Sequence, residues 1–197
     1  MRVLPANDYR VEPWSNGGGF TRVIAAGRHR ACRNVDPGRC PWDWRLSLAE
    51  IARAGPFSAL PGVARQLMLV EGGPLLLRVD GRATRLDGIG DTLRFTGTDR
   101  VEADPGDSPV QVLNLMWRAA CLEGRLEPID LARWTPIARE TASPSRLIYL
   151  IDALPAWFDA PVAAGDTVRL PNRSSLPDQA PAARGILATL DATTQPG

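Results

Sequence analysis

A run of three glycines, Gly17–Gly19, is the first segment of the sequence whose residue types could bind a ligand. Glycine has no side chain to cover the backbone, so successive glycines leave N–H groups free to hold an anion or a carboxylate. The run lacks the Gly-Lys-Ser/Thr ending of a phosphate loop and the spacing of a dinucleotide-binding fingerprint. The pattern therefore leaves two interpretations open, an anion-binding loop or a flexible turn before a strand.

A second candidate is the alternating segment Trp44–Ala49. Because successive side chains of a strand point to opposite faces, Arg45 and Ser47 share one face. If that face lines an interior, the arginine supplies a fork of donors and the hydroxyl one adaptable donor, a combination that suits a carboxylate. If the face lies in solvent, the same residues form an ordinary polar row. Arg65 either converges on the same place or only flanks a strand.

Metal and thiol chemistry are poorly supported by the sequence. The chain has one histidine, His29, and three cysteines, Cys32, Cys40 and Cys121. One histidine cannot build a multi-histidine metal centre, and the set lacks a fourth donor and a Cys-x-x-Cys pair. Three cysteines are too few for a disulfide framework, so we expect reduced thiols. We predict no metal, no cofactor and no catalytic residue.

The balance of positive and negative residues limits the kinds of partner that the protein is expected to bind. In a chain of 197 residues, 23 basic residues, all of them arginine, stand against 22 acidic ones, and the formal net charge is +1. Such a chain has no general attraction to nucleic acid or to an anionic membrane surface. No stretch approaches the roughly 20 apolar residues that span a bilayer, and the first residues lack the apolar core of a signal peptide. We therefore predict a cytoplasmic protein that binds neither nucleic acid nor membranes.

Short apolar segments between turn residues predict a mainly β fold, a sandwich or a barrel. The Asp80-Gly81 pair predicts a tight hairpin, because glycine accepts a positive φ. Short helices are expected only near Ile51–Ala54 and Ile129–Trp134, and a mobile loop over Asn34–Pro41. The expected strands are Phe20–Ala25, Trp44–Leu48, Gln66–Val70, Leu75–Val79, Arg82–Leu86, Thr92–Phe95 and Val110–Trp117.

Two segments resemble each other. Each begins with an apolar strand, at Arg65 and at Arg146, and ends in Gly-Asp-Thr, an apolar residue, Arg and another apolar residue, at Gly90–Phe95 and at Gly165–Leu170. The starts of the landmarks are 25 residues apart in the first copy (90 − 65) and 19 in the second (165 − 146). The match predicts a duplication, in which the two segments form equivalent hairpins of two related barrels.

The residues also resemble a known family, HutD/Ves. The N-terminal signature matches at Trp14, Asn16–Gly19 and Thr21-Arg22, and later blocks match in the same order up to about residue 118. The later blocks are Trp44–Ile51 with Gly55–Ser58, Pro61–Arg65 with Leu69–Gly72, and Asn114–Met116. The sequence departs from the family pattern, which has charged residues at Ser15, Phe20 and Val23 and an Asp-Phe pair at Val112 and Leu113.

The resemblance implies a bicupin, that is, two β-barrels of the RmlC-like jelly-roll type in one compact chain, without the metal-binding histidines of typical cupins. We expect a first barrel over about residues 1–110, a second, smaller barrel over 111–190 and a frayed tail over 191–197. The resemblance further implies a non-enzymatic protein of bacterial histidine utilisation that binds a small carboxylate such as N-formylglutamate or urocanate and acts as a regulator or metabolite sensor. The alternatives are a metal-independent cupin enzyme (an isomerase or a hydrolase), a general stress-response protein, and a protein whose second barrel forms an interface, for example in a homodimer.

The predicted ligand site combines both lines of reasoning. Arg45, Ser47 and Arg65 are expected to face a pocket in the first barrel, with the glycine turn at its rim. A buried arginine needs a counterion, which is either the ligand or a structural carboxylate such as Glu50 or Glu71. The complete set of predicted ligand-binding residues is Asn16, Gly17, Gly18, Gly19, Thr21, Arg45, Ser47, Arg65 and Asn114.

Overall fold

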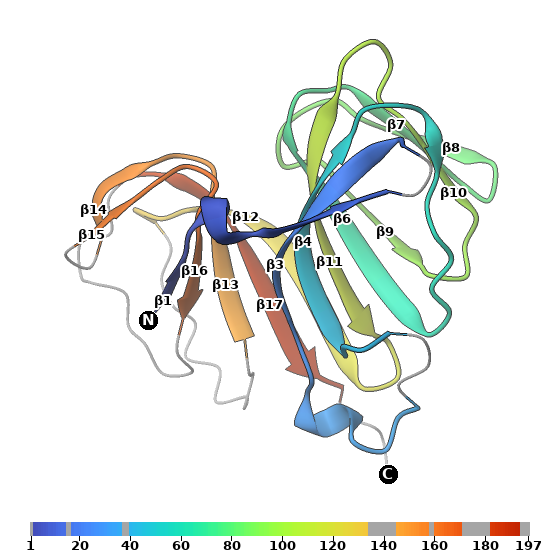
Figure 1. The fold of residues 1–197 in the computed structure, drawn as a ribbon, viewed down its shortest axis with the longest axis horizontal. Helices are drawn as coiled ribbons and strands as arrows, with labels where there is room; N and C mark the ends of the chain where they lie inside the picture. The colour runs from blue at the N-terminus through green and yellow to red at the C-terminus, as the bar shows by residue number, and fades with distance from the viewer. Residues whose placement is uncertain are drawn as a thin grey trace. The chain divides into compact units, whose positions relative to one another are not determined.

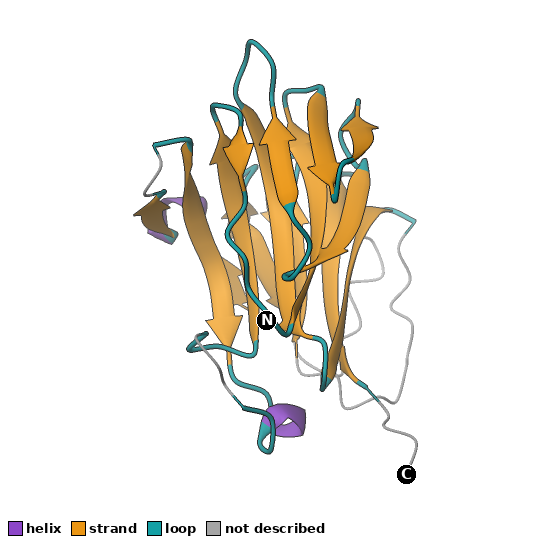
Figure 2. Cartoon of the chain, turned by 90° about the vertical axis from the view of Figure 1, so that its right-hand side faces the viewer, coloured by secondary structure: helices purple, strands orange, loops and turns teal. Residues whose placement is uncertain are grey.

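The structure is a computed structural model that describes residues 2–14, 17–36, 40–133, 145–157, 160–170 and 182–193. This part of the chain is mainly β, with two short 3-10 helices, η1 (Ala6–Asp8) and η2 (Arg30–Cys32), and no α-helix (Figure 2). None of its helices is long and apolar enough to cross a membrane. The strands, labelled in part in Figure 1, are β1 (Arg2–Leu4), β2 (Arg10–Pro13), β3 (Gly19–Gly27), β4 (Trp44–Ile51), β5 (Gly55–Pro56), β6 (Val63–Glu71), β7 (Leu75–Val79), β8 (Arg82–Leu86), β9 (Thr92–Thr96), β10 (Val101–Asp104), β11 (Val110–Arg118), β12 (Leu122–Asp130), β13 (Ser145–Leu150), β14 (Leu154–Trp157), β15 (Ala160–Val162), β16 (Thr167–Leu170) and β17 (Arg184–Ala192).

The described chain divides into two compact units. The larger unit comprises residues 10–124 with Thr193, and the smaller unit comprises the described residues of 2–9 and 125–192. The division near residue 110 that the sequence suggested falls at the first residue of β11, which pairs with β4 and β6 on its two sides. Residues 2–9, expected in the first barrel, cluster with the smaller unit, in which β1 pairs with β16.

The larger unit contains two antiparallel sheets. One has six strands in the order β2-β3-β4-β11-β6-β9, and the other has four in the order β5-β10-β7-β8. Apolar side chains of both sheets form one core, in which Leu67 and Leu69 of β6 meet Leu75 and Leu77 of β7. Strand β7 has alternately more and less buried residues, as expected of a strand with one face in the core, whereas β4, β6 and β11 are buried or half-buried at nearly every position and so on both faces.

The smaller unit contains a five-stranded sheet in the order β1-β16-β13-β17-β12, and the two-stranded hairpin β14-β15. Its core is apolar, with Ile148 and Leu150 of β13 packed among Val168 and Leu170 of β16. The prediction of two closed barrels is not confirmed, since no sheet closes on itself in the described part of the chain. Among the described residues, the outer strands β2 and β9 each pair with one neighbour only.

The seven strands predicted from the sequence are all present, and β7 and β8 have the predicted bounds. The two predicted helices are wrong for the described residues. Ile51 is the last residue of β4, and the N–H groups of Ala52 and Arg53 both point to the carbonyl oxygen of Gly18. Residues 129–130 end strand β12 and residues 131–133 form a turn. Pairing with a distant segment therefore overrides the local pattern.

The predicted internal repeat corresponds to two strand pairs with matching register. Arg65 lies opposite Phe95 in the β6-β9 pair, and Arg146 lies opposite Leu170 in the β13-β16 pair. Each pair ends in the same two backbone hydrogen bonds, between Leu69 and Gly90-Asp91 in one and between Leu150 and Gly165-Asp166 in the other. Both glycines have a positive φ, 98° for Gly90 and 88° for Gly165. Sequence and backbone geometry therefore repeat together.

The expectation of reduced thiols is wrong for Cys32 and Cys121, which form a disulfide with their Cα atoms 5.4 Å apart. Cys32 ends η2 and Cys121 follows β11, so the pairing of β3 and β11 with β4 brings together two cysteines that are 89 residues apart. Cys40 is a free, buried cysteine. Residues 37–39 of the predicted mobile loop and residues 194–197 of the predicted tail lie outside the described residues.

Candidate functional site

A cavity of about 410 Å³ opens in the larger unit, over the face of the six-stranded sheet that looks toward the four-stranded sheet. Strands β2, β3, β4, β11 and β6 all contribute to its lining. The lining is polar in its floor and aromatic in its wall, where Trp14 and Phe57 lie. The polar lining residues are Glu12, Thr21, Arg45, Ser47, Ser58, Arg65 and Asn114.

Strand register explains why the polar residues meet. Met116 of β11 lies opposite Arg45 of β4 and also opposite Arg65 of β6, so the two arginines flank it in one row. Asn114, two residues away and therefore on the same face, lies opposite Ser47. The structure thus places five of the predicted site residues around one cavity. They are Thr21, Arg45, Ser47, Arg65 and Asn114.

Arg65 is a buried cation without an acidic partner. Its exposed fraction is 5%, and no acidic side chain of the described residues lies within ion-pair distance of its guanidinium group. One Nη donates a hydrogen bond of 2.6 Å to the Ser58 carbonyl oxygen, the guanidinium carbon lies 5.7 Å from the centre of the Phe95 ring, and Nε has no partner. Burial lowers the pKa of Arg65 to about 10. A charge in this position is costly until an anion joins it.

Arg45 is held differently. Its Nη2 donates to Oε2 of Glu12 at 2.8 Å, while its Nε is buried without a hydrogen-bond partner. The counterion is therefore neither Glu50 nor Glu71, the two carboxylates that the sequence suggested; Glu71 instead accepts a hydrogen bond from Gln111. Glu12 reaches Arg45 from β2, the outer strand of the sheet.

The floor between the arginines carries further polar atoms without partners. Ser47 Oγ and Asn114 Oδ1 are both buried and form no hydrogen bond within the described chain. A buried polar atom that lacks a partner costs about 1–3 kcal/mol, so these groups favour a ligand that bonds to them. The Ser47 hydroxyl and the Arg65 guanidinium group can donate to the oxygens of a carboxylate, whereas Asn114 Oδ1 can only accept and favours a ligand that also carries an N–H or O–H donor.

The aromatic wall is itself positioned by a predicted residue. Thr21 Oγ1 accepts a hydrogen bond of 2.8 Å from the indole N–H of Trp14, and the Trp14 and Phe57 rings meet edge to face with their centres 6.2 Å apart. Thr21 thus holds Trp14 against the cavity. The apolar part of a small ligand can pack against these two rings.

The glycine run lies outside the cavity lining. Gly19 packs so closely against β4 that a Cβ atom there would lie 1.9 Å from the carbonyl oxygen of Glu50, and Gly17 has a φ of 66°. The carbonyl oxygen of Gly18 accepts the bonds from Ala52 and Arg53 described above. Close backbone packing therefore explains Gly19, and the positive φ explains Gly17. Asn16 lies outside the described residues.

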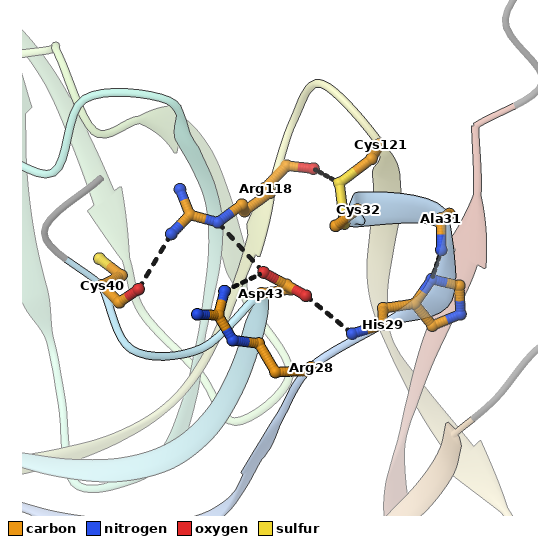
Figure 3. A network of polar contacts seen from close by, with 8 residues as sticks. All are labelled: Arg28, His29, Ala31, Cys32, Cys40, Asp43, Arg118 and Cys121. Carbon is orange, nitrogen blue, oxygen red and sulfur yellow. Dashed lines mark hydrogen bonds and ion pairs between the residues drawn. A yellow bond between two sulfur atoms is a disulfide. The ribbon is translucent and has the colours of Figure 1, made fainter. Parts of the chain in front are cut away.

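A second polar cluster, which the sequence did not predict, surrounds Asp43 (Figure 3). This buried carboxylate accepts hydrogen bonds from the His29 backbone N–H (2.7 Å), from Arg28 (3.0 Å) and from Arg118 (3.3 Å). Burial opposes ionisation, but these bonds outweigh it and hold the pKa of Asp43 below its ordinary value. Arg118 also donates to the carbonyl oxygen of Cys40. The cluster links Arg28 and His29, which follow β3, to Asp43, which precedes β4, and to Arg118 at the end of β11.

His29 belongs to the same cluster. Its Nδ1 accepts a hydrogen bond of 3.1 Å from the Ala31 N–H and caps η2, and burial lowers the pKa of its ring, helped by the charge of Arg30. Within the described residues, no group of three or more His, Cys, Asp or Glu side chains could hold a metal ion. The contact that His29 makes is therefore structural. It caps η2, the helix whose last residue, Cys32, forms the disulfide with Cys121.

The fold is cupin-like. A cupin 2 conserved barrel domain protein from Leptotrichia buccalis is similar over 98% of this chain and 97% of its own, with a TM-score of 0.56 and 10% identity. The HutD family model matches residues 6–187, and the chain belongs to the HutD family. HutD from Pseudomonas fluorescens SBW25 (formate condition) has a similar fold, with a TM-score of 0.78 over 98% of this chain and 99% of its own at 24% identity.

Two relatives are similar in sequence. A 21.2 kDa uncharacterized protein in the hutC 3' region of Pseudomonas putida is 32% identical over 130 residues, which is 66% of this chain and 65% of that protein. Protein Ves of Citrobacter koseri is 33% identical over 131 residues, 66% of this chain and 62% of that protein. The matched stretch thus spans slightly less than two thirds of each relative, and the HutD/Ves resemblance stated from the motifs is confirmed.

Proposed function

We propose that this HutD-family protein binds a small carboxylate in the cavity of the larger unit and acts without catalysis, as a regulator or metabolite sensor in histidine utilisation. The observation that carries the proposal is Arg65, a buried guanidinium group without an acidic partner in the described chain, which faces a cavity. The family and the P. putida relative in the hutC 3' region support the link to histidine utilisation.

The charges of the cavity favour one carboxylate group at Arg65. The charged lining residues are Arg45, Arg65 and Glu12, which leave one positive charge uncompensated. A carboxylate on Arg65 balances that charge and can accept a hydrogen bond from the hydroxyl of Ser47, while Asn114 Oδ1 can accept from an N–H or O–H group elsewhere on the acid. The apolar part of the acid then lies against Trp14 and Phe57.

The hydrogen bonds made by the acidic side chain in the cavity support a role without catalysis. Glu12 is the one acidic side chain among the described lining residues, and both of its oxygens already accept hydrogen bonds, from Arg10 and from Arg45. General acid–base catalysis needs a group that is free to take a proton from the substrate. The arrangement is better suited to holding an acid than to transforming it.

A thermal-unfolding screen tests the proposal. N-formylglutamate, urocanate and simple carboxylic acids are each added to the protein, and at 100 times its dissociation constant a ligand adds about 2.7 kcal/mol of stability. We expect at least one acid to raise the unfolding midpoint of the protein, and Arg65→Met to remove that rise. If no acid shifts the midpoint, or if the rise survives in folded Arg65→Met, the proposal is wrong.

A further inference from the structure

We infer that Glu12 is a built-in counterion of Arg45 that a second acidic group of the ligand displaces, so that Glu12 sets the preference between dicarboxylates and monocarboxylates. The inference rests on the proposed function, because it divides the same cavity into two anion positions. One position, at Arg65, has no competing acid in the described chain; the other, at Arg45, is already occupied by Glu12.

The two arginines are separate positions on one floor. They extend from β4 and β6, the two neighbours of β11, and Met116 lies between them in register. Strands lie about 4.8 Å apart, so the two Cα atoms are roughly 10 Å from one another. Arg65 turns toward Ser58 and the Phe95 ring, whereas Arg45 turns toward β2 and Glu12. One carboxylate group therefore engages one arginine, and a diacid is needed to engage both.

Glu12 can leave this contact more easily than Arg45 can. The Glu12 side chain is 38% exposed and lies on an outer strand, and its Oε1 accepts a bond of 2.6 Å from Arg10, whose own side chain is 74% exposed. The Arg45 side chain is only 16% exposed. A Glu12 carboxylate released from Arg45 keeps Arg10 and water as partners, whereas Arg45 stays in the cavity and needs a new anion.

This asymmetry has a consequence for selectivity. A monocarboxylate that binds at Arg65 leaves the pair of Glu12 and Arg45 intact. A dicarboxylate gains a second charge-assisted contact at Arg45, whose buried Nε has no partner, but it must first displace Glu12. Glu12 thus lowers the affinity for dicarboxylates specifically, and it prevents Arg45 from being left without a counterion when the second acidic group is missing.

The test compares diacids and monoacids of equal carbon number. Succinate, glutarate and adipate are titrated calorimetrically against butyrate, pentanoate and hexanoate, with wild type and Glu12→Gln. Because a partly exposed ion pair is lost, we expect the ratio of diacid to monoacid affinity to rise about threefold to tenfold in Glu12→Gln. Glu71→Gln removes the same charge outside the cavity lining and serves as the matched control, with an unchanged ratio. Arg45→Met removes the second anion position, so its ratio of diacid to monoacid affinity should lie below that of Glu12→Gln, while monoacids still bind.

The outcomes separate the inference from the proposed function. If Glu12→Gln changes diacid and monoacid affinity equally, or lowers the ratio, Glu12 is not a competitor and the inference is wrong, while the carboxylate site stands. If no acid of either series binds to the wild-type protein, the proposed function itself fails. Unfolding midpoints verify that each variant is folded, and Glu12→Ala repeats the test with the side chain removed altogether.

Discussion

The two repeated strand pairs, β6-β9 and β13-β16, have the same register and the same Gly-Asp turn, yet their interiors differ. In the smaller unit Ile148 and Leu150 of β13 and Val168 and Leu170 of β16 enter an apolar core, and Arg146, one step earlier on β13, is partly exposed. In the larger unit β6 carries Leu67 and Leu69 into a core of the same kind, but one step earlier Arg65 enters the cavity. One backbone pattern therefore occurs in two settings: a partly exposed arginine beside an apolar core in the smaller unit, and a buried arginine facing a polar cavity in the larger unit.

The comparison indicates where a duplicated fold can acquire a site. Arg65 and Arg146 are equivalent in register, and Arg65 is buried while Arg146 is partly exposed. A buried arginine destabilises the unit that contains it unless an anion joins it. The larger unit contains two features that offset such a cost, the disulfide of Cys32 with Cys121 and the hydrogen bonds of Asp43 with His29 and Arg118.

Loss of the disulfide should have the largest effect on stability. Cys32 and Cys121 are 89 residues apart, and closing a loop of that length restricts the unfolded chain by roughly 4–5 kcal/mol. Cys121→Ser should therefore lower the free energy of unfolding by up to about that amount. Denaturant unfolding with and without dithiothreitol measures it; the reductant should destabilise wild type and leave Cys121→Ser unchanged. Equal sensitivity of both proteins to the reductant would contradict the prediction.

The equivalent aspartates of the two Gly-Asp turns should differ in importance. Asp166 is buried and accepts hydrogen bonds from the N–H groups of Ala6 (2.7 Å) and Ala163 (2.9 Å), whereas Asp91 accepts from Asp87 and Gly88 at an exposed position. Asp166→Ala leaves these two N–H groups without hydrogen-bond partners, and we expect the free energy of unfolding to fall by about 3 kcal/mol. Asp91→Ala should cost less, because water replaces the carboxylate. An equal loss in both variants would show that burial does not distinguish the two turns.

A smaller effect is expected from acid. In the smaller unit, hydrogen bonds from the Arg184 side chain and backbone lower the pKa of Asp152 to about 2. Because the pKa is lower in the folded state, the pair stabilises the protein above the ordinary carboxyl pKa and loses that contribution as the pH falls from about 4 to 2. The pair is exposed and screened by solvent, so its contribution should be the smallest of the three effects. Unfolding of Asp152→Asn and wild type should differ at pH 7 and converge near pH 2; a constant difference would argue against the assignment.

Much of the fold could be predicted because its signals are local. The hairpin of Leu75–Val79 and Arg82–Leu86 follows from apolar runs on either side of Asp80-Gly81, and the repeat follows from Gly-Asp-Thr in two places. The shared face of Arg45 and Ser47 follows from parity within one strand. Each of these inferences needs only residues that are close in sequence.

The partners in the site could not be predicted, because they depend on register across several strands. Glu12 of β2 lies opposite Thr21 of β3, which in turn lies opposite Ala49 of β4. The contact of Glu12 with Arg45 therefore depends on two strand pairings. A bulge at Ile24 interrupts the second of them. A bulge shifts register by one residue, and the sequence contains no clear signal for it. The disulfide is hidden for the same reason, as its cysteines meet only after β3 and β11 have both paired with β4.

The central claim, that Arg65 is the anion anchor of the larger unit, is tested most directly by titrating pentanoate into three proteins under NMR observation: wild type, Arg65→Met and Arg146→Met. Methionine keeps much of the apolar stem and removes the charge. The account predicts that wild type and Arg146→Met bind pentanoate with the same affinity, with shifts around Ser47 and Asn114, and that folded Arg65→Met does not bind. Undiminished binding of pentanoate to folded Arg65→Met would contradict the account.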